Sequence, residues 1–324
     1  MTKTVSPRRP SAAVRTWHGA AAVVLTAGDC EAVVLPSLGM LVASFTHRGD
    51  ELVALPGGLA GYKAGHTTAI PLLYPWANRL ARDRYRVGNL EVDLRGLDLH
   101  TDENGLPIHG LMLARPEWEV TRLGAGPRSA RLAARFDFGV HEDLMAGFPF
   151  PHEVAVDVTL AASGLRIVTT VRPSGPVSVP IAFGWHPYLR LPGGPRDSWD
   201  LALPARAHAA LDGRGIPTGR ARPAEAEAAP LAGRDFDDLF ALGPDRIITL
   251  SSPERRLTVT YDDGYPYAQI YSPIGEPFCA IEPMTAPTNA LVSGDHPAVR
   301  PGETYSAAFT LAVSVPSRRK QQGV

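Results

Sequence analysis

Short segments in which apolar and polar residues alternate recur along almost the whole chain. From Val154 to Leu160, every second residue is a branched aliphatic one, which is the period of two that a half-buried strand shows. Turn-forming triplets such as Arg48-Gly49-Asp50 and Asp262-Asp263-Gly264 separate such segments, and the 324 residues include 31 Gly and 31 Pro. Because Gly and Pro interrupt helices and favour turns, this pattern predicts a fold built mainly from antiparallel strands.

The segments expected to form strands are spread over the sequence at residues 20–26, 32–36, 41–46, 91–94, 117–122, 130–138, 153–161, 165–172, 247–250, 257–261, 268–272 and 305–315. No long stretch has helical periodicity, and only Ala221–Ala229, rich in Ala and Glu, is expected to be a short helix or a surface loop. No composition break or internal repeat divides the chain. We therefore predict an all-β fold, a large antiparallel sandwich or barrel, as one domain over residues 17–315 between disordered tails at 1–16 and 316–324.

Charge and motif content exclude several classes of function. The formal net charge of −1 gives no basic footprint for nucleic acid. Lysine occurs only at Lys3, Lys63 and Lys320, so lysine chemistry and a phosphate-binding P-loop are not expected. The sequence contains no HExxH, GxSxG or CxxC motif, which argues against the common zinc-protease, serine-hydrolase and thiol-redox sites.

The location of the protein is also constrained. The apolar segment 20–26 is too short to cross a membrane, and the nearby Asp29 and Glu31 do not suit a secretory signal. The two cysteines, Cys30 and Cys279, are far apart in the sequence and are expected to be reduced thiols. These features predict a cytoplasmic protein without a membrane or nucleic-acid partner.

One carboxylate near the C-terminus stands out. Glu282 directly follows the apolar run 277–281 and precedes a loop with Pro283 and Pro287, so we expect it at a strand end, half out of the core. Partial burial raises the pKa of a carboxyl group and makes its ionised form a better base. The alternative is a carboxylate that only braces the loop.

Two polar clusters precede it in the first half of the chain. Asn78-Arg79 lies between an apolar run and a turn, where an amide and a forked guanidinium can bind hydroxyl groups or oxyanions. His109-Gly110 combines an imidazole with a residue that allows close approach of a ligand. Each cluster also has a purely structural interpretation. Arg79 would then be an ion-paired arginine, and His109 a surface histidine.

Two further clusters lie in the second half of the chain. His186 sits among aromatic residues in the segment 183–188, a composition typical of sugar pockets, because pyranose faces stack on rings. Asp237 and Asp238 are flanked by Phe236 and Phe240. The alternatives are a core histidine and an Asx turn. None of these clusters has the local spacing of metal ligands, so no metal and no other cofactor is expected.

Taken in order, these motifs resemble those of the aldose 1-epimerases, or mutarotases, of the galactose-mutarotase-like β-supersandwich fold. The family has an Asn-Arg segment, a His-Gly, a His-Pro-Tyr or His-Thr-Tyr, an Asp before an aromatic residue, and a Glu. Here the same order is Asn78-Arg79, His109-Gly110, His186-Pro187-Tyr188, Asp237 with Phe240, and Glu282, and the resemblance extends over about residues 20–315. It implies the supersandwich fold and a sugar as substrate. Because the wider family also includes hexose-6-phosphate epimerases, the resemblance does not choose between a free and a phosphorylated sugar.

The resemblance also implies roles for individual residues. Glu282 would be the general base that removes the proton from the anomeric hydroxyl, and His186 the general acid that protonates the ring oxygen. The residues that would bind and orient the sugar are Arg79, His109 and Asp237, with Asn78 and Gln269 as accessory contacts. Asp238 is the alternative to Asp237, because adjacent aspartates can exchange places in an alignment.

Three functions stay open on the sequence. The first is interconversion of the α and β anomers of a free aldohexose, which needs two proton transfers and no cofactor. The second is an epimerase of hexose 6-phosphates, with Arg82, Arg84 and Arg86 as candidates to hold the phosphate. The third is a carbohydrate-binding sandwich without catalysis. The sequence does not distinguish a monomer from a homodimer.

Overall fold

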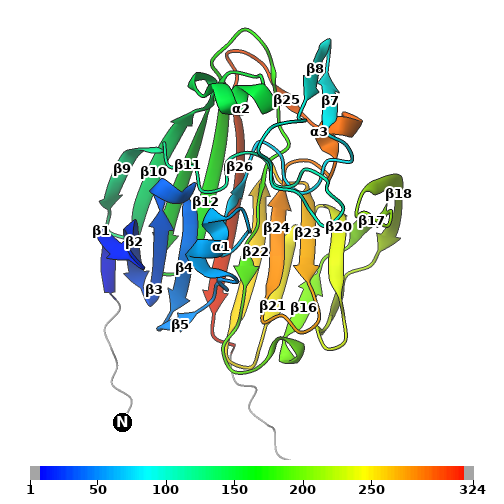
Figure 1. Ribbon diagram of the computed structural model, residues 1–324. Coiled ribbons are helices and arrows are strands. Elements are labelled where there is room, and N and C mark those ends of the chain that lie inside the picture. Colours follow the sequence, from blue (N-terminus) through cyan, green and yellow to red (C-terminus); the bar gives the residue numbers. More distant parts are fainter. Residues whose placement is uncertain (1–7, 317–324) are drawn as a thin grey trace, which may run out of the picture.

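A nine-stranded antiparallel sheet forms one layer of the computed structural model, which describes residues 8–316 (Figure 1). Its strand order is β19-β16-β21-β22-β26-β12-β11-β10-β9. The strands are β9 (Glu119–Ala125), β10 (Ser129–Asp137), β11 (His152–Ala161), β12 (Gly164–Pro173), β16 (Asp200–Leu203), β19 (Glu227–Pro230), β21 (Ile247–Ser251), β22 (Arg256–Asp263) and β26 (Tyr305–Ser314).

Two sheets together cover this layer. A five-stranded meander contains β1 (Arg8–Trp17), β2 (Ala20–Gly28), β3 (Cys30–Leu35), β4 (Leu41–His47) and β5 (Asp50–Glu51), and its strand β2 contacts β10 and β11. An eight-stranded sheet has the order β18-β17-β20-β23-β24-β14-β6, with β15 also paired to β24. Its strands are β6 (Leu72–Leu73), β14 (Gly184–Trp185), β15 (Tyr188–Leu189), β17 (Arg206–Leu211), β18 (Pro217–Ala224), β20 (Phe236–Leu242), β23 (Tyr267–Ser272) and β24 (Cys279–Met284).

The remaining elements are short. Two strand pairs, β7 (Arg84–Val87) with β8 (Leu90–Asp93) and β13 (Val179–Pro180) with β25 (Ala298–Val299), stand apart from the large sheets. The α-helices are α1 (Gly58–Lys63), α2 (Glu142–Gly147) and α3 (Ala290–Ser293). Three 3₁₀ turns are η1 (Pro36–Leu38), η2 (Phe138–Val140) and η3 (Arg196–Ser198). The β7–β8 hairpin, α2 and α3 lie at one end of the sandwich (Figure 1).

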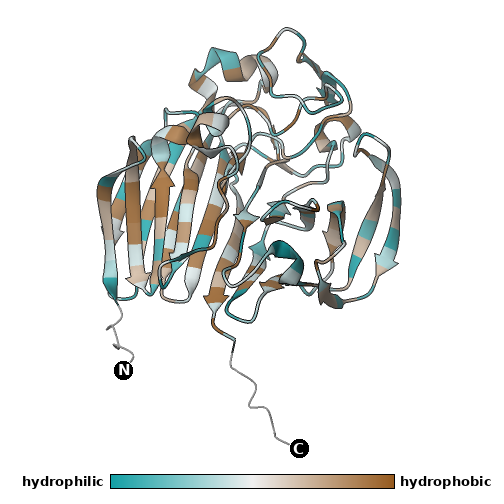
Figure 2. Cartoon of the chain, turned by 60° about the horizontal axis from the view of Figure 1, so that its bottom comes forward, coloured by the Kyte–Doolittle hydropathy of each residue, from teal (hydrophilic) through white to brown (hydrophobic). Residues whose placement is uncertain are grey.

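The alternation in the sequence becomes the two faces of each strand. In β11 every second residue is buried, and Val154, Val156 and Leu160 are at most 1% exposed. Strongly apolar residues recur along the strands of the sandwich (Figure 2). Between the layers, Trp185 of β14 packs against Phe309 of β26 with ring centroids 6.1 Å apart. The predicted all-β class is confirmed, because apolar side chains at every second position bury one face of each sheet.

Two local predictions are wrong. The expected tail over residues 1–16 is strand from Arg8 onward, because Ser11–Trp17 pair with Ala20–Thr26 in a hairpin, so the segment 20–26 is the second strand. The segment 221–229 is neither a helix nor a free loop. It contributes to β18 and β19, since pairing with β17 and β16 satisfies its backbone. Residues 1–7 and 317–324 lie outside the described part of the chain.

Candidate active site

A pocket of about 160 Å³ opens over strands β20, β23 and β24 of the eight-stranded sheet. Loops between α1 and β7 and the loop that carries His109 complete its walls. Its lining residues are Thr67, Asn78, Arg79, Ile108, His109, His186, Tyr188, Asp237, Tyr271 and Glu282. Six of the seven residues expected from the sequence thus line one pocket, and the seventh, Gln269, contacts Asp237.

Glu282 is more deeply placed than expected. It is the fourth residue of β24, opposite Gln269 of β23, and it is 1% exposed. The expectation of a half-buried strand end is wrong, because Pro283 and Met284 continue the pairing with β23 beyond the glutamate. The core therefore surrounds this carboxyl group, and the pocket reaches down to it.

His186 meets Glu282 from the connection between β14 and β15. Its Nε2 lies 3.2 Å from Oε1 of Glu282. The imidazole stacks on the ring of Tyr188 at a centroid distance of 4.2 Å and an interplanar angle of 11°. The backbone N–H of His186 donates to the carbonyl of Pro71, 3.1 Å away. Packing on Tyr188 thus orients the ring, and the hydrogen bond to Pro71 fixes the backbone of the residue that carries it.

Burial shifts the pKa values of Glu282 and His186 in opposite directions. Desolvation raises the pKa of Glu282 well above its usual value, with the nearby Asp237 adding to this effect and Arg79 opposing it. Desolvation lowers the pKa of His186 to about 3. Both shifts favour the uncharged form. Burial thus favours one proton for the pair, on the carboxyl group, beside a neutral imidazole.

His109 forms the wall next to His186. Its backbone has φ +64°, and its ring meets that of His186 edge to face at 5.5 Å. Desolvation, and then the charge that His186 would carry, lower the pKa of His109 well below its usual value. A neutral imidazole in this place can both donate and accept a hydrogen bond.

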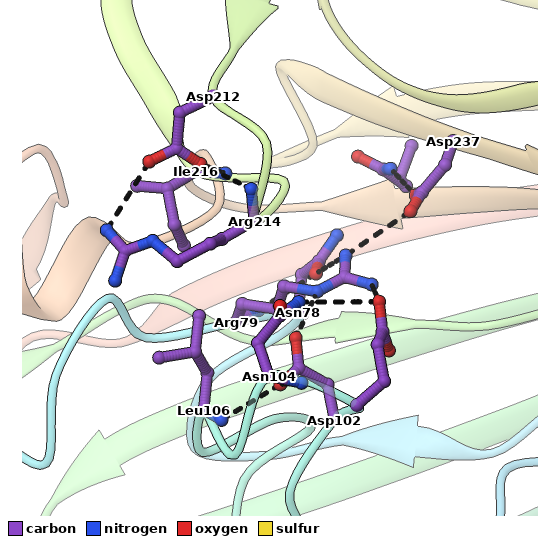
Figure 3. A network of polar contacts seen from close by, with 11 residues as sticks. Asn78, Arg79, Asp102, Asn104, Leu106, Asp212, Arg214, Ile216 and Asp237 are labelled. Carbon is purple, nitrogen blue, oxygen red and sulfur yellow. Dashed lines mark hydrogen bonds and ion pairs between the residues drawn. The ribbon is translucent and has the colours of Figure 1, made fainter.

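Arg79 is fixed by two carboxylates (Figure 3). Its Nε donates to Asp102 at 2.8 Å, and its Nη1 lies 3.4 Å from Oδ2 of Asp237. Burial lowers the pKa of Arg79, but the two carboxylates outweigh this and the net pKa is raised. Asn78, at φ +58°, accepts from the backbone N–H of Arg79 at 2.8 Å. The guanidinium is thereby aimed at the pocket.

Asp102 is a site residue that the sequence did not reveal. Its side chain is 2% exposed, and Oδ1 accepts from the backbone N–H groups of Asn104 and Leu106 at 2.9 and 2.8 Å. In the sequence it stands in a polar turn, Thr101–Gly105, with nothing that connects it to Arg79. Thr67 and Tyr271 were also missed. Tyr188 appeared in the aromatic segment 183–188 and in the motif His186-Pro187-Tyr188, but without a role of its own.

The two aspartates of β20 point to different partners. Asp237 lines the pocket and accepts from Nε2 of Gln269 at 2.6 Å. Asp238 contacts His208 of β17, with 2.6 Å between Oδ1 and Nε2. Successive residues of a strand face opposite sides, so Asp237 belongs to the pocket and Asp238 does not line it.

Several buried polar atoms in and under the pocket have no hydrogen-bond partner among residues 8–316. They are Nδ1 of His109, Nδ1 of His186, Oε1 of Gln269 and Oε2 of Glu282. An unpaired buried polar atom costs about 1–3 kcal/mol, so most such atoms in proteins are satisfied. These four atoms leave hydrogen-bonding capacity for a ligand with hydroxyl groups.

The other candidate residues lie elsewhere. Arg84 and Arg86 form ion pairs with Asp93 and Glu91 on the exposed β7–β8 hairpin, and Arg82 is exposed beside it. None of the three lines the pocket. Cys30 and Cys279 are buried free thiols.

Over residues 8–316, no group of His, Cys, Asp or Glu has an arrangement that holds a metal ion. Nor does any helix in that range have the length and apolar character needed to cross a membrane.

Known proteins are similar to this chain in sequence and in fold. The Escherichia coli K12 protein YihR, described as uncharacterized, is 29% identical over 283 residues, which cover 84% of this chain and 86% of YihR. A galactose mutarotase-like protein from Clostridium acetobutylicum superposes with a TM-score of 0.84 at 19% identity, over 95% of this chain and 99% of that one.

A galactose 1-epimerase from Lactobacillus acidophilus gives a TM-score of 0.76 at 14% identity, over 96% of this chain and all (100%) of its own. These structures confirm the galactose-mutarotase-like fold. The sequence model of the family described as Aldose 1-epimerase matches residues 21–312. The chain therefore belongs to the aldose 1-epimerase family.

Proposed function

We propose that the protein interconverts the α and β anomers of a free aldose by opening and reclosing its ring. The contact of 3.2 Å between Nε2 of His186 and Oε1 of Glu282 carries this proposal. Ring opening removes a proton from the anomeric hydroxyl and adds one to the ring oxygen, and reclosure reverses both steps. A carboxyl group and an imidazole at one end of a pocket supply both partners.

The proton count of the pair is consistent with this reaction. In the free pocket, burial favours the proton on Glu282 and a neutral imidazole at His186. Transfer of that proton across the 3.2 Å contact gives a carboxylate and an imidazolium. Glu282 then accepts the anomeric proton while His186 donates to the ring oxygen. The pair holds one proton before and after each opening, so no further proton donor is required.

The rest of the pocket suits the binding of hydroxyl groups. Arg79 offers guanidinium donors, and Asp237 offers a carboxylate at the same wall. His109 faces the pocket beside His186 and can donate to a developing negative charge on an oxygen. Asn78 and Gln269 hold Arg79 and Asp237 in place.

The test is a panel of mutarotation rates. Freshly dissolved α-D-glucose, α-D-galactose and glucose 6-phosphate are followed by polarimetry or NMR exchange with and without the protein. We expect acceleration for a free aldose. Acceleration for the phosphorylated sugar alone would support the hexose-6-phosphate alternative, and tight sugar binding without acceleration would support a carbohydrate-binding protein.

A further inference from the structure

The loop that follows the candidate base takes no part in the proposed proton transfers. It runs over residues 285–289, between β24 and α3. Thr285, Ala286 and Thr288 are each at most 3% exposed. Most loops run over the surface of a protein, because their backbone polar groups need partners. A loop buried beside the candidate base must therefore find its hydrogen-bond partners in neighbouring segments.

The first residue of the loop is bound to the segment that carries His186. The backbone N–H and the Oγ1–H of Thr285 both donate to the carbonyl oxygen of Phe183, at 3.0 and 2.9 Å. Phe183 precedes His186 by three residues. Two hydrogen bonds from one residue thus help to fix the segment of the candidate acid against the end of β24.

The last residue of the loop, Asn289, is bound to the segment that carries Arg79. Its backbone N–H donates to the carbonyl oxygen of Arg79 at 2.9 Å. Its side-chain Oδ1 accepts from the backbone N–H of Ala81 at 2.8 Å. One residue thus binds a carbonyl group and an amide group of the same segment, and these two contacts hold that segment in both position and direction.

Residues 79–81 lie between two supports. They follow β6 and precede β7, outside the helices and sheets. On one side an isolated β-bridge joins Arg79 to Ile108, and on the other side Asn289 makes its two hydrogen bonds. Because no sheet ladder supplies the hydrogen bonds of residues 79–81, loss of one support loosens the backbone that carries the guanidinium.

The conformation of Asn289 restricts which residue can occupy this place. Its backbone has φ +72°, in the left-handed region that Gly and Asn enter more readily than other residues. Asn289 also directly precedes α3, where an Asn side chain commonly accepts from an N–H group of its own helix. It makes no such capping bond here, and its Oδ1 binds Ala81 instead. A glycine would suit the backbone but would leave the N–H of Ala81 without this acceptor.

Asn289 is not among the residues that line the pocket. It can therefore act on a sugar only through the segment that it holds. The side chain of Arg79 is 12% exposed, and its Nη1 lies 3.4 Å from Oδ2 of Asp237. A shift of the Arg79 backbone moves these donors relative to the pocket, and a misplacement of about 1 Å can reduce a rate by about 10²-fold.

We propose that Asn289 is a positioning residue for Arg79, and that the loop 285–289 sets the distance between the candidate base and the guanidinium. The inference rests on the proposed use of Arg79 to bind the sugar. One short segment, residues 282–289, then carries the base at one end and holds the sugar-binding arginine at the other.

Three variants separate the side-chain contact from the backbone contact. Asn289→Gly keeps the φ angle and the N–H that donates to Arg79, and removes only the acceptor for Ala81. Asn289→Asp keeps an acceptor at the same place, and Asp also tolerates this φ. Asn89→Gly removes an exposed amide from the turn between β7 and β8, and is the matched control. Circular dichroism checks that each variant is folded.

The first measurement needs no substrate. It follows the Nε–H signal of Arg79 by ¹⁵N NMR, identified by its loss in Arg79→Ala. In the unmodified protein we expect a rigid Nε–H, because this group donates to Asp102 at 2.8 Å. Asn289→Gly should lower its heteronuclear NOE, whereas Asn289→Asp and Asn89→Gly should not. An unchanged Arg79 signal in folded Asn289→Gly would overturn the proposal, whatever the protein does with sugars.

The second measurement is a double-mutant cycle. KM and kcat for mutarotation of the best aldose are compared in the unmodified protein, Asn289→Gly, Arg79→Ala and the double variant. We expect Asn289→Gly to raise KM about three- to tenfold, as one hydrogen bond of ordinary net strength would, with a smaller change in kcat and with near-normal KM in Asn289→Asp. In the Arg79→Ala background the same change should have no further effect. Equal effects in both backgrounds would contradict an action through Arg79.

Failure of the two proposals gives different results. If no sugar is accelerated but the Arg79 signal loosens in Asn289→Gly, the mutarotation is wrong and the positioning role stands. If a sugar is accelerated and neither the Arg79 signal nor KM changes in Asn289→Gly, only the positioning role is wrong.

Discussion

Nε2 of His186 lies 3.2 Å from Oε1 of Glu282, and both side chains are at most 5% exposed. The contact joins His186, in the connection between the short strands β14 and β15, to Glu282 in the middle of β24. Burial favours the uncharged form of each group, so one proton serves both. This shared proton is the chemical feature from which the first predictions follow.

Glu282→Gln removes the acid–base group and keeps the shape of the side chain. We expect kcat for mutarotation to fall by about 10²–10⁴-fold, the usual contribution of such a group, measured by polarimetry with the best aldose. His186→Ala should cause a loss of similar size. Glu276→Gln, an exposed carboxylate in the turn before β24, is the control. Near-normal rates in both site variants would show that the pair is not catalytic.

The pH dependence of kcat/KM follows from the direction of the two pKa shifts. The active pair holds one proton, which it keeps above the lowered pKa of His186, about 3, and below the raised pKa of Glu282. We therefore expect a plateau that extends well below the pKa of about 6.5 of an ordinary imidazole, with a fall on the alkaline side as Glu282 ionises. An acid limb centred near pH 6.5 would contradict this.

Stability must be followed in the same pH series. In the unfolded chain His186 takes up a proton near its usual pKa of 6.5, whereas in the fold it does so only at about 3. Glu282 takes up a proton near its usual pKa of 4.5 when unfolded but already carries one in the fold, so the unfolded pair binds more protons than the folded pair only below about pH 4.5. The stability that this pair contributes is therefore lost as the pH falls from about 4.5 to about 3. Circular dichroism at each pH separates loss of fold from loss of catalysis.

Asp102 positions Arg79 through a buried ion pair. Asp102→Asn leaves the guanidinium without its main partner, and a hydrogen bond to a charged group is worth about 1.5–3 kcal/mol. We expect kcat/KM to fall about tenfold or more, with most of the change in KM if Arg79 mainly binds substrate. Glu103→Gln is the control, since Glu103 is 76% exposed and its Oε1 is 3.9 Å from the same guanidinium. Equal effects of the two variants would argue against a positioning role.

Gly110 allows the His109 loop to lie against Tyr74. It has φ +77°, and a Cβ atom would lie 2.1 Å from the carbonyl oxygen of Tyr74. Gly105 has φ +71° with nothing within 4 Å of such an atom. Gly105→Ala should therefore cost only the backbone strain, about 1 kcal/mol, whereas Gly110→Ala should lower stability clearly more and reduce activity. Thermal unfolding of the two variants makes the comparison, and equal losses would mean that the close approach is unimportant.

The sequence pattern predicted that strands exist more reliably than it predicted where each strand ends and how the strands pair. Period-two alternation identifies β11, since its apolar residues must face one side. It did not identify β1, where few residues are apolar and pairing with β2 decides the conformation. The segment 221–229 has a helix-like composition but forms strands, because tertiary pairing overrides a weak local preference.

The sequence by itself determined the all-β class and, through five motifs in order, the residues that gather at one pocket. Only the tertiary structure decided how deeply Glu282 is buried, that Asp102 holds Arg79, and that a second cavity lies beside Asp237. The physical reason is that the alternation of apolar and polar residues depends only on which face of each strand is buried. The contacts between Arg79 and Asp102, and the cavity beside Asp237, depend on how segments far apart in the sequence pack together.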